Sequence, residues 1–202
     1  MWVSEAGGVS NSGRANATDV LLSSFWYADA LGLAARRGVR TFCRQTLVGG
    51  HYGLLRPGAG GRILLANPDF WVAWFWRRLM GRTALDVGAT APRWLRVYAH
   101  CGPRGGIALC VVNVDANRAA RVSFGAYRGL AKNREEYHIA AGPGGLRARD
   151  LRINGEPSPT LAALDGGAVP RARYGAAATP LRVAPSTIVF VSVPRARTEF
   201  CE

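Results

Sequence analysis

The sequence predicts an α/β segment followed by an all-β segment within its 202 residues. In the first part, apolar runs and helical periodicity alternate as strand, helix, strand and helix, which is typical of parallel βα folds. From about Thr83 the pattern changes to short apolar or alternating runs between turns rich in Gly, Pro and Asn. That change indicates an antiparallel β-sandwich. We therefore expect two domains, residues 1–82 and residues 83–202.

The first predicted strand begins at Trp2 and ends on a carboxylate, Glu5. Trp2 and Val3 suit a buried position in a parallel strand. The glycines that follow, beginning with Gly7, allow a sharp turn and a close backbone approach to a ligand. A carboxylate at the carboxyl end of a parallel strand lies where barrel enzymes keep their catalytic groups. On this spacing alone, an exposed glutamate at a frayed terminus is the alternative interpretation.

A helix is predicted over residues 19–37, with Asp19 at its start and Gly38 at its C-terminal turn. Its periodic apolar positions are Leu21, Phe25, Ala28 and Leu31. Just before it, Asn16 belongs to the chain's single N-x-S/T sequence. Asn16 is either a glycosylation acceptor or, together with Thr18, a candidate helix cap.

A second parallel strand is predicted over residues 39–48, followed by a glycine-rich loop that contains Tyr52. Asn67, Pro68 and Asp69 then provide a cap, a first-turn proline and an acid at a helix N-terminus. The aromatic residues of that helix predict a core face, and Gly81 ends it.

The all-β part contains six predicted strands separated by turns. They are residues 94–100, 107–114, 121–124, 136–140, 151–153 and 187–193. Residues 142–145 and 166–180 predict loose loops because they are rich in Gly, Ala and Pro. Glu135 and Glu136 are expected to be solvated surface charges.

The formal net charge is +13, and Lys132 is the single lysine. Either biased residue usage or a polyanionic partner explains this charge. The arginines are spread along the chain, and no RNP motif, zinc-finger spacing or basic helix is present, so nucleic acid is disfavoured as the partner. There is no apolar run of about 18 residues that would span a membrane, and no secretory signal precedes the first strand.

No metal or cofactor site is predicted, because the histidines and cysteines have no metal-ligand spacing and no phosphate-binding loop is present. Cys43 and Cys110 lie in apolar strand sequence and are expected to be buried thiols.

Several segments, in order along nearly the whole chain, carry a family resemblance. They are WVSEAGG, NSG, SFWY, CRQTL, NPDFW, WRRLMG, LRVYAHC, REEYH and LRING. Together they resemble the plant heparanase-like branch of glycoside hydrolase family 79, whose members are retaining β-glucuronidases. The resemblance implies that residues 1–82 are the last strands and helices of a (β/α)₈ barrel and that the substrate is an acidic glycan or a glucuronide.

The resemblance also implies roles for individual residues. Glu5 matches the family's nucleophile in the W-x-x-E motif. The implied substrate-binding residues are Asn11, Ser12, Gly13 and Tyr52. A disulfide between Cys101 and Cys201 is implied, together with an oxidising compartment. The sequence departs from the family pattern at Ser4, where Gly is common, and at Ser10, where Tyr is often found.

The family's acid/base glutamate is preceded by Asn, and no Asn-Glu pair occurs in this sequence. We therefore expect the C-terminal part of such a hydrolase, which lacks the N-terminal half of the barrel and is inactive alone. By family, the protein is expected to be a secreted glycoprotein of the cell wall, extracellular space, lysosome or vacuole, with peripheral membrane association. The alternative is a non-catalytic β-sandwich module that binds acidic polysaccharide.

Overall fold

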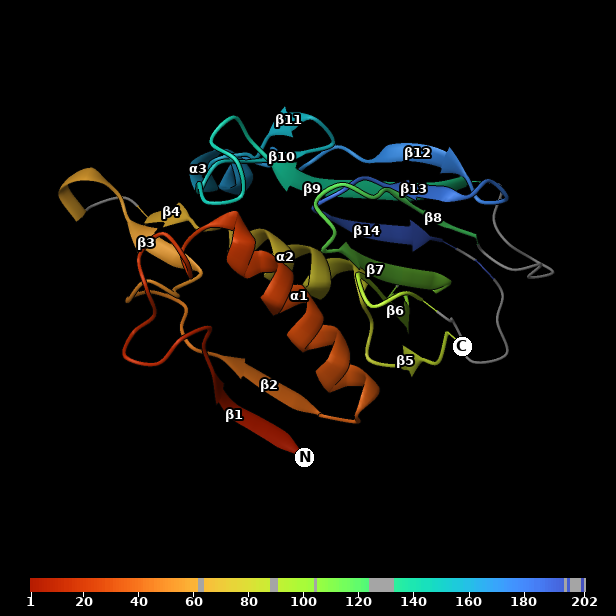
Figure 1. Cartoon of the computed structure of the whole chain (residues 1–202), viewed down its shortest axis with the longest axis horizontal. Helices are drawn as coiled ribbons and strands as arrows, with labels where there is room; N and C mark the ends of the chain where they lie inside the picture. Colours follow the sequence, from red (N-terminus) through yellow and green to blue (C-terminus); the bar gives the residue numbers. More distant parts are fainter. Residues whose placement is uncertain are drawn as a thin grey trace. The chain divides into compact units, whose positions relative to one another are not determined.

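The computed structural model describes residues 1–61, 64–87, 91–103, 105–123, 133–194, 196 and 201. They form a mixed α/β structure with more strand than helix (Figure 1). Its residues group into two compact units that interleave along the chain. The first is residues 1–74 with 141–170, and the second is residues 75–140 with 171–202. The domain boundary after residue 82 stays a prediction.

A strand–helix–strand arrangement opens the first unit, as predicted. Strand β1 (Trp2–Ala6) pairs in parallel with β2 (Thr41–Arg44), and α1 (Leu21–Arg36) lies between them in the sequence. Parallel pairing places the carboxyl ends of the two strands side by side, with Ala6 opposite Arg44. The residues that follow these two strand ends therefore come together.

The start of α1 differs from the prediction. Its N-cap is Val20, which makes no side-chain capping bond, so neither Asn16 nor Thr18 caps the helix. The N–H groups of Leu21 and Leu22 instead donate to backbone carbonyl groups of residues 148 and 146. A segment distant in sequence thus satisfies donors that a local side chain was expected to satisfy.

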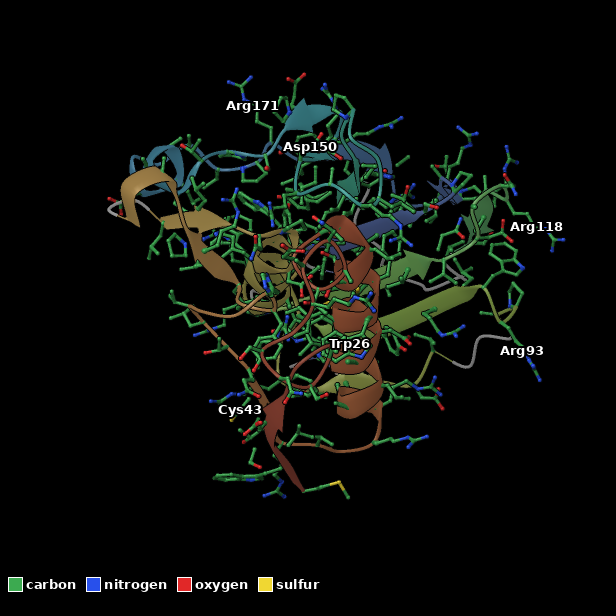
Figure 2. All side chains as sticks on the ribbon, turned by 60° about the vertical axis from the view of Figure 1, so that its left-hand side comes forward. Trp26, Cys43, Arg93, Arg118, Asp150 and Arg171 are labelled. Carbon is green, nitrogen blue, oxygen red and sulfur yellow. A yellow bond between two sulfur atoms is a disulfide. The ribbon has the colours of Figure 1, made fainter. Side chains whose placement is uncertain are left out.

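Two burial predictions in the parallel strands are wrong. Trp2 is 73% exposed, and the thiol of Cys43 on β2 is also exposed (Figure 2). Among the described residues, β1 and β2 form a two-stranded sheet. Burial of a parallel strand requires neighbouring layers and strands, and this pair does not supply them at Trp2 and Cys43.

Helix α2 (Pro68–Leu79) starts at Pro68, as predicted, and its last residues belong to the second unit. The other remaining elements of the first unit are short. They are β3 (Leu55–Pro57), the 3₁₀ turn Ala59–Gly61, β4 (Leu64–Ala66), β10 (Leu151–Ile153), β11 (Glu156–Pro157) and α3 (Leu161–Asp165). Strands β3 and β4 pair with each other, as do β10 and β11, and both pairs are antiparallel.

The second unit is built on an antiparallel sheet whose strands lie in the order β12-β9-β14-β7-β6-β5. A separate antiparallel pair joins β8 and β13. The bounds are β5 (Ala84–Leu85), β6 (Leu95–Cys101), β7 (Ile107–Asn113), β8 (Ala120–Val122), β9 (Asn133–Ala141), β12 (Arg173–Ala176), β13 (Leu181–Val183) and β14 (Thr187–Val193).

The two faces of this sheet bury different partners. On one face, Phe75 of α2 packs against Phe190 and Tyr137, with ring centroids 5.5 and 4.8 Å apart. On the other face, alternate valines of β14 share an apolar core with Leu181 and Val183 of the β8–β13 pair. The described strands form no closed barrel.

The predicted loop at residues 166–180 is wrong in part, because it contains β12, which pairs with β9 along four residues. The sequence RYGA has no apolar alternation, and its pairing with β9 decides its conformation. Position 124, at the end of one predicted strand, lies outside the described residues.

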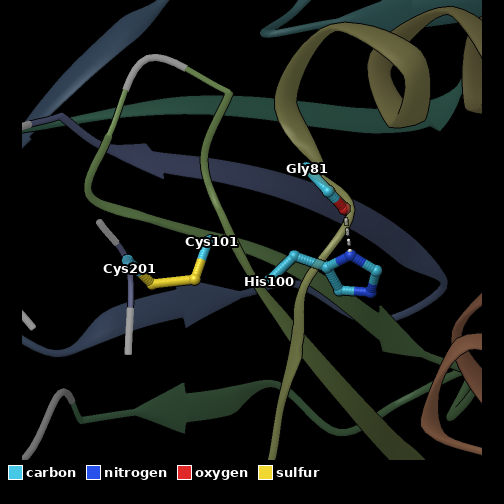
Figure 3. Close-up of a disulfide and its surroundings, with 4 residues drawn as sticks. All are labelled: Gly81, His100, Cys101 and Cys201. Carbon is cyan, nitrogen blue, oxygen red and sulfur yellow. Dashed lines mark hydrogen bonds between the residues drawn. A yellow bond between two sulfur atoms is a disulfide. The ribbon is translucent and has the colours of Figure 1, made fainter. Parts of the chain in front are cut away.

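The predicted disulfide is confirmed. Cys101 at the end of β6 is bonded to Cys201, with Cα atoms 5.3 Å apart (Figure 3), which falls in the usual range. Next to it, the N–H of Gly81 donates to the carbonyl oxygen of Cys101 at 2.9 Å. A Cβ at Gly81 would lie 2.2 Å from that oxygen. Gly81 therefore permits this close backbone approach in addition to ending α2.

Candidate active site

Glu5 lies one residue from the carboxyl end of β1, and its side chain lines a hollow of about 380 Å³. We call this the Glu5 hollow. It is lined by Glu5, Gly7, Val9, Ser10, Asn11, Ser12, Gln45 and Tyr52. The volume falls within the range of small-molecule sites, roughly 300–1,000 Å³. All its lining residues belong to the first unit, and apart from Glu5 in β1 they come from the segments that follow β1 and β2.

The chemistry of the Glu5 hollow suits a ligand rich in hydroxyl groups. Asn11 and Gln45 carry amides that both donate and accept, and the serines and Tyr52 carry hydroxyls. Among the described lining residues, Glu5 is the single carboxylate. The hollow therefore combines one exposed carboxylate with several neutral hydrogen-bonding groups.

The loop after β1 has a strained backbone at the hollow. Asn11, Ser12 and Gly13 have φ angles of 55°, 65° and 83°. Non-glycine residues rarely adopt positive φ, and such residues cluster at ligand-binding sites. This conformation faces Asn11 and Ser12 into the hollow, whereas Gly13 does not line it.

Gly13 has a packing role instead. A Cβ at this position would lie 2.5 Å from the hydroxyl oxygen of Thr18 and 2.9 Å from the backbone nitrogen of Tyr52. The buried Thr18 hydroxyl accepts the N–H of Arg14 and lies 2.9 Å from the carbonyl oxygen of His51. The N–H of His51 donates to the carbonyl of Ser12. These contacts fasten the loop after β1 to the loop after β2.

Arg44, the last residue of β2, lies beneath these loops. Its guanidinium donates to the carbonyl oxygens of Gln45 at 2.9 Å and Tyr52 at 2.8 Å, and to the Asp69 carboxylate at 2.7 Å. It also lies over the rings of Trp26 and Tyr27 on α1, 5.3 and 4.9 Å from their centroids. One buried cation thus holds the backbone of two residues that line the Glu5 hollow.

The Arg44–Asp69 ion pair is almost completely buried, with side chains 5% and 2% exposed. Asp69 also accepts hydrogen bonds from the hydroxyls of Ser23 and Ser24 on α1. Burial raises the pKa of Asp69 to about 6, against the opposing effects of Arg44 and the two serines. Burial likewise raises the pKa of Tyr27 to about 12. Asp69 was predicted as an acid at the start of α2, and its bonds to α1 and β2 extend that structural role.

The structure brings four predicted site residues, Glu5, Asn11, Ser12 and Tyr52, around one hollow. Their roles stay predictions. Sequence reasoning missed Gln45, because the predicted strand over residues 39–48 contained it, whereas β2 ends at Arg44 and leaves Gln45 directly after the strand end. Asn16 is exposed, with a φ of 57°, at the far end of the same loop.

No group of three metal-ligating side chains occurs among the residues that the structure describes. Within those same residues, no helix is both long enough and apolar enough to span a membrane.

Comparison with known proteins gives a consistent assignment. Residues 1–32 match the model of the glycosyl hydrolase family 79 N-terminal domain. Heparanase-like protein 1 of Arabidopsis thaliana is 34% identical over 99% of this chain, which spans 42% of that protein. Baicalin-beta-D-glucuronidase of Scutellaria baicalensis is 35% identical over 96% of this chain and 36% of its own length. The chain therefore spans about two-fifths of the curated relatives that it matches.

Solved structures share the fold at low sequence identity. The GH51 alpha-L-arabinofuranosidase of Thermotoga petrophila RKU-1 matches with a TM-score of 0.63 and 13% identity, over 94% of this chain and 42% of that one. The catalytic domain of GH30 xylanase C from Talaromyces cellulolyticus matches with a TM-score of 0.62 and 14% identity, over 95% and 40%. By the family model at residues 1–32 and the plant relatives along almost its whole length, the chain is similar to members of glycosyl hydrolase family 79.

Proposed function

We propose that this chain is the part of a retaining β-glucuronidase that supplies the catalytic nucleophile, Glu5. The observation that supports this most strongly is the position of the Glu5 carboxylate. It lies near the carboxyl end of a parallel strand and faces a hollow with Asn11, Ser12, Gln45 and Tyr52. The relatives include a baicalin-beta-D-glucuronidase and a hyaluronoglucuronidase from Hirudo nipponia, so the proposed substrate is a β-glucuronoside of an acidic glycan or glycoconjugate.

In the proposed reaction, a Glu5 oxygen attacks the anomeric carbon of a β-glucuronosyl unit, and the bond to the leaving oxygen breaks as that oxygen takes a proton. The glycosyl–Glu5 ester is then hydrolysed by water. Retaining hydrolysis uses a second carboxyl group about 5–5.5 Å from the first, which protonates the leaving oxygen and later deprotonates the water. We propose that this group lies in an N-terminal barrel segment outside the 202 residues, because Glu5 is the single described carboxylate in the hollow. In this proposal, β1, α1, β2 and α2 complete the barrel and the second unit is a β-sandwich.

The proposed location is an oxidising compartment outside the cytosol. The Cys101–Cys201 disulfide supports it, since structural disulfides persist in secreted and vacuolar-type environments. The exposed position of Asn16 is compatible with glycosylation there.

The test is covalent trapping of the nucleophile. The chain would be co-expressed with the N-terminal barrel segment of a heparanase-like relative, treated with a fluorosugar glucuronide, and analysed by peptide mass spectrometry. We expect a single adduct on Glu5, and we expect Glu5→Gln to reduce turnover of an aryl glucuronide by roughly a thousandfold or more.

The matched control is Glu156→Gln, which removes one carboxylate from the exposed strand β11 and should leave both labelling and turnover unchanged. An adduct on another carboxylate, or full turnover by Glu5→Gln, would refute the assignment. Turnover by the 202 residues alone would refute the external acid/base group and leave the nucleophile standing.

A further inference from the structure

Three polar side chains of β9 lie on the same face of the sheet as apolar side chains of the neighbouring strand β14. Arg134, Glu136 and His138 alternate along the strand and therefore point to the same side. The valines of β14 that lie opposite Glu136 and His138 belong to the hydrophobic core of the second unit. Arg134 and Glu136 are only 3% and 6% exposed. Charges buried in this way are costly unless they are paired and hydrogen-bonded.

Glu136 contacts one partner on β9 through each of its two carboxylate oxygens. Glu136 accepts from Nε of Arg134 at 2.8 Å through one oxygen and lies 2.7 Å from Nε2 of His138 through the other. Arg134 also donates to the carbonyl oxygens of Ala176 and Thr179, each at 2.5 Å. Both oxygens of Glu136 are thus engaged within the cluster.

Strand β12 is shaped around this cluster. Gly175 lies opposite Arg134 in the β9–β12 register. A Cβ on Gly175 would lie 2.6 Å from a Glu136 oxygen and 3.2 Å from Nη2 of Arg134. The absence of a side chain at Gly175 therefore makes room for the ion pair.

Above the cluster lies a second hollow of about 310 Å³, which we call the β9 hollow. Its floor includes Arg134, Glu136 and His138, and its rim includes Arg173, Tyr174 and Arg182. Arg173 and Arg182 are exposed, and their side chains make no hydrogen bond or ion pair with any part of the chain that the structure describes. Tyr174 is 71% exposed.

The charges at the β9 hollow do not balance. Three arginines line it against one carboxylate, which leaves two positive charges before His138 is considered. Arg121 on β8 lies directly opposite Arg182 and is also exposed. Like charges in directly opposed positions destabilise a strand pair. The remaining nearby acid, Glu135, lies on the opposite face of β9 by alternation.

We propose that the β9 hollow binds a carboxylate group of an acidic polysaccharide, with Arg173 and Arg182 as the recognition residues. Arginine presents paired donors that match a carboxylate in two hydrogen bonds. An anion bound to Arg182 also offsets the repulsion between Arg182 and Arg121. The buried Arg134–Glu136–His138 cluster fixes the floor of the hollow, so that the site exists before the ligand arrives.

A polysaccharide is favoured over a nucleic acid by the shape of the site. Sequence-independent nucleic-acid binding uses a basic groove with successive aromatic stacking platforms. The β9 hollow is a single concavity, and its one aromatic lining residue, Tyr174, points to the side of β12 opposite Arg173 by alternation. The choice of a uronic-acid ligand rests on the proposed function, whereas the presence of an anion site rests on the second unit alone.

The test measures binding of a hyaluronate oligosaccharide to the full 202-residue chain by calorimetry. A neutral glucan of equal length and a single-stranded oligonucleotide serve as the comparison ligands. We expect Arg173→Ala/Arg182→Ala to weaken hyaluronate binding about tenfold, which corresponds to the loss of two solvent-screened charge-assisted contacts.

The matched control is Arg93→Ala/Arg118→Ala, which removes the same two charges from exposed positions of the second unit that do not line the β9 hollow (Figure 2). It should change the affinity less than twofold. Equal losses in the two double variants, or no loss in the first, would overturn the proposal. Binding of the oligonucleotide at equal strength with the same loss would overturn it in favour of a nucleic-acid ligand.

Two readouts separate this proposal from the proposed function. Glu5→Gln should bind hyaluronate at the β9 hollow as well as the unchanged chain does, with the same loss on adding Arg173→Ala/Arg182→Ala. Covalent labelling of Glu5 should be the same with and without the rim arginines. Urea unfolding midpoints for the two double variants should agree, which shows that both are folded when binding is measured.

Discussion

Replacing Arg44 tests whether one buried ion pair holds the Glu5 hollow together. Arg44→Met removes a guanidinium that bonds the Asp69 carboxylate and the carbonyl groups of Gln45 and Tyr52. Because Asp69 is 2% exposed, its carboxylate cannot regain water when the cation is lost. Breaking a buried pair by removing one partner typically costs about 3–5 kcal/mol of unfolding free energy.

The informative measurement is the double-mutant cycle with Asp69→Asn. The amide at Asp69→Asn keeps bonding capacity towards Ser23 and Ser24 but carries no charge, so the double variant buries neither an unpaired cation nor an unpaired anion. We expect its loss of stability to be smaller than the sum of the single losses by about 2 kcal/mol, within the range measured for residues in contact. That difference corresponds to about a thirtyfold change in the unfolding equilibrium.

Urea unfolding followed by tryptophan fluorescence measures all four proteins, and Trp26 beside the guanidinium reports on the site. The control is Arg118→Met, whose side chain is 70% exposed and 3.7 Å from Asp115. An exposed pair of this kind contributes about 0–1 kcal/mol. Losses that add to within about 0.5 kcal/mol in the Arg44 and Asp69 cycle would refute the coupling on which the argument rests.

Three further predictions concern other parts of the chain. The pKa of Asp69 is raised to about 6 from 3.8 in the unfolded chain, so the folded state binds this proton more tightly. The contribution of Asp69 to the unfolding free energy should therefore fall as the pH rises from about 4 to 6, and Asp69→Asn should flatten that part of the pH profile. Cys201→Ser removes a bond between residues 100 apart and should lower the unfolding free energy by about 3–5 kcal/mol through chain entropy. Cys43→Ser, at an exposed free thiol, should not shift the urea midpoint, and equal midpoints for the two variants would contradict a stabilising role of the disulfide. Gly13→Ala should destabilise more than Gly38→Ala, because both glycines have positive φ but only Gly13 has atoms close to the added methyl group; equal midpoints in thermal unfolding would show that contact with Thr18 is unimportant.

The sequence predicted the strand–helix–strand order, the start of α2 and the disulfide, because each depends on local chemistry or on a family pattern. It wrongly predicted burial at Trp2 and Cys43, which are exposed, since burial depends on which layers cover a strand. It also placed Glu136 among the solvated charges. That residue is 6% exposed, because Arg134 and His138 lie two positions away on the same face of β9 and pair with it. The alternating pattern was present in the sequence, but its direction towards the core follows from the register with β14.

The two hollows share a structural device that explains why charged residues lie buried beneath both. Arg44 donates to loop carbonyl groups of Gln45 and Tyr52 while pairing with Asp69. Arg134 donates to the carbonyl groups of Ala176 and Thr179 while pairing with Glu136. Gln45, Tyr52 and Thr179 lie outside the strands, so their carbonyl groups have no ladder partner, and a guanidinium with five donors satisfies several carbonyl groups at once.

Apolar residues of similar volume would support the packing, and in other proteins such replacements are often neutral or stabilising. They would remove the guanidinium donors from those carbonyl groups, however, and the loops that line each hollow would lose this restraint on their conformation. On this argument the buried arginines matter more for the shape of the sites than for the stability of the chain. Each buried arginine is paired with a carboxylate at 2.7–2.8 Å, which neutralises the positive charge of its guanidinium group. A ligand is therefore recognised by the exposed groups around each hollow and not by the buried arginine.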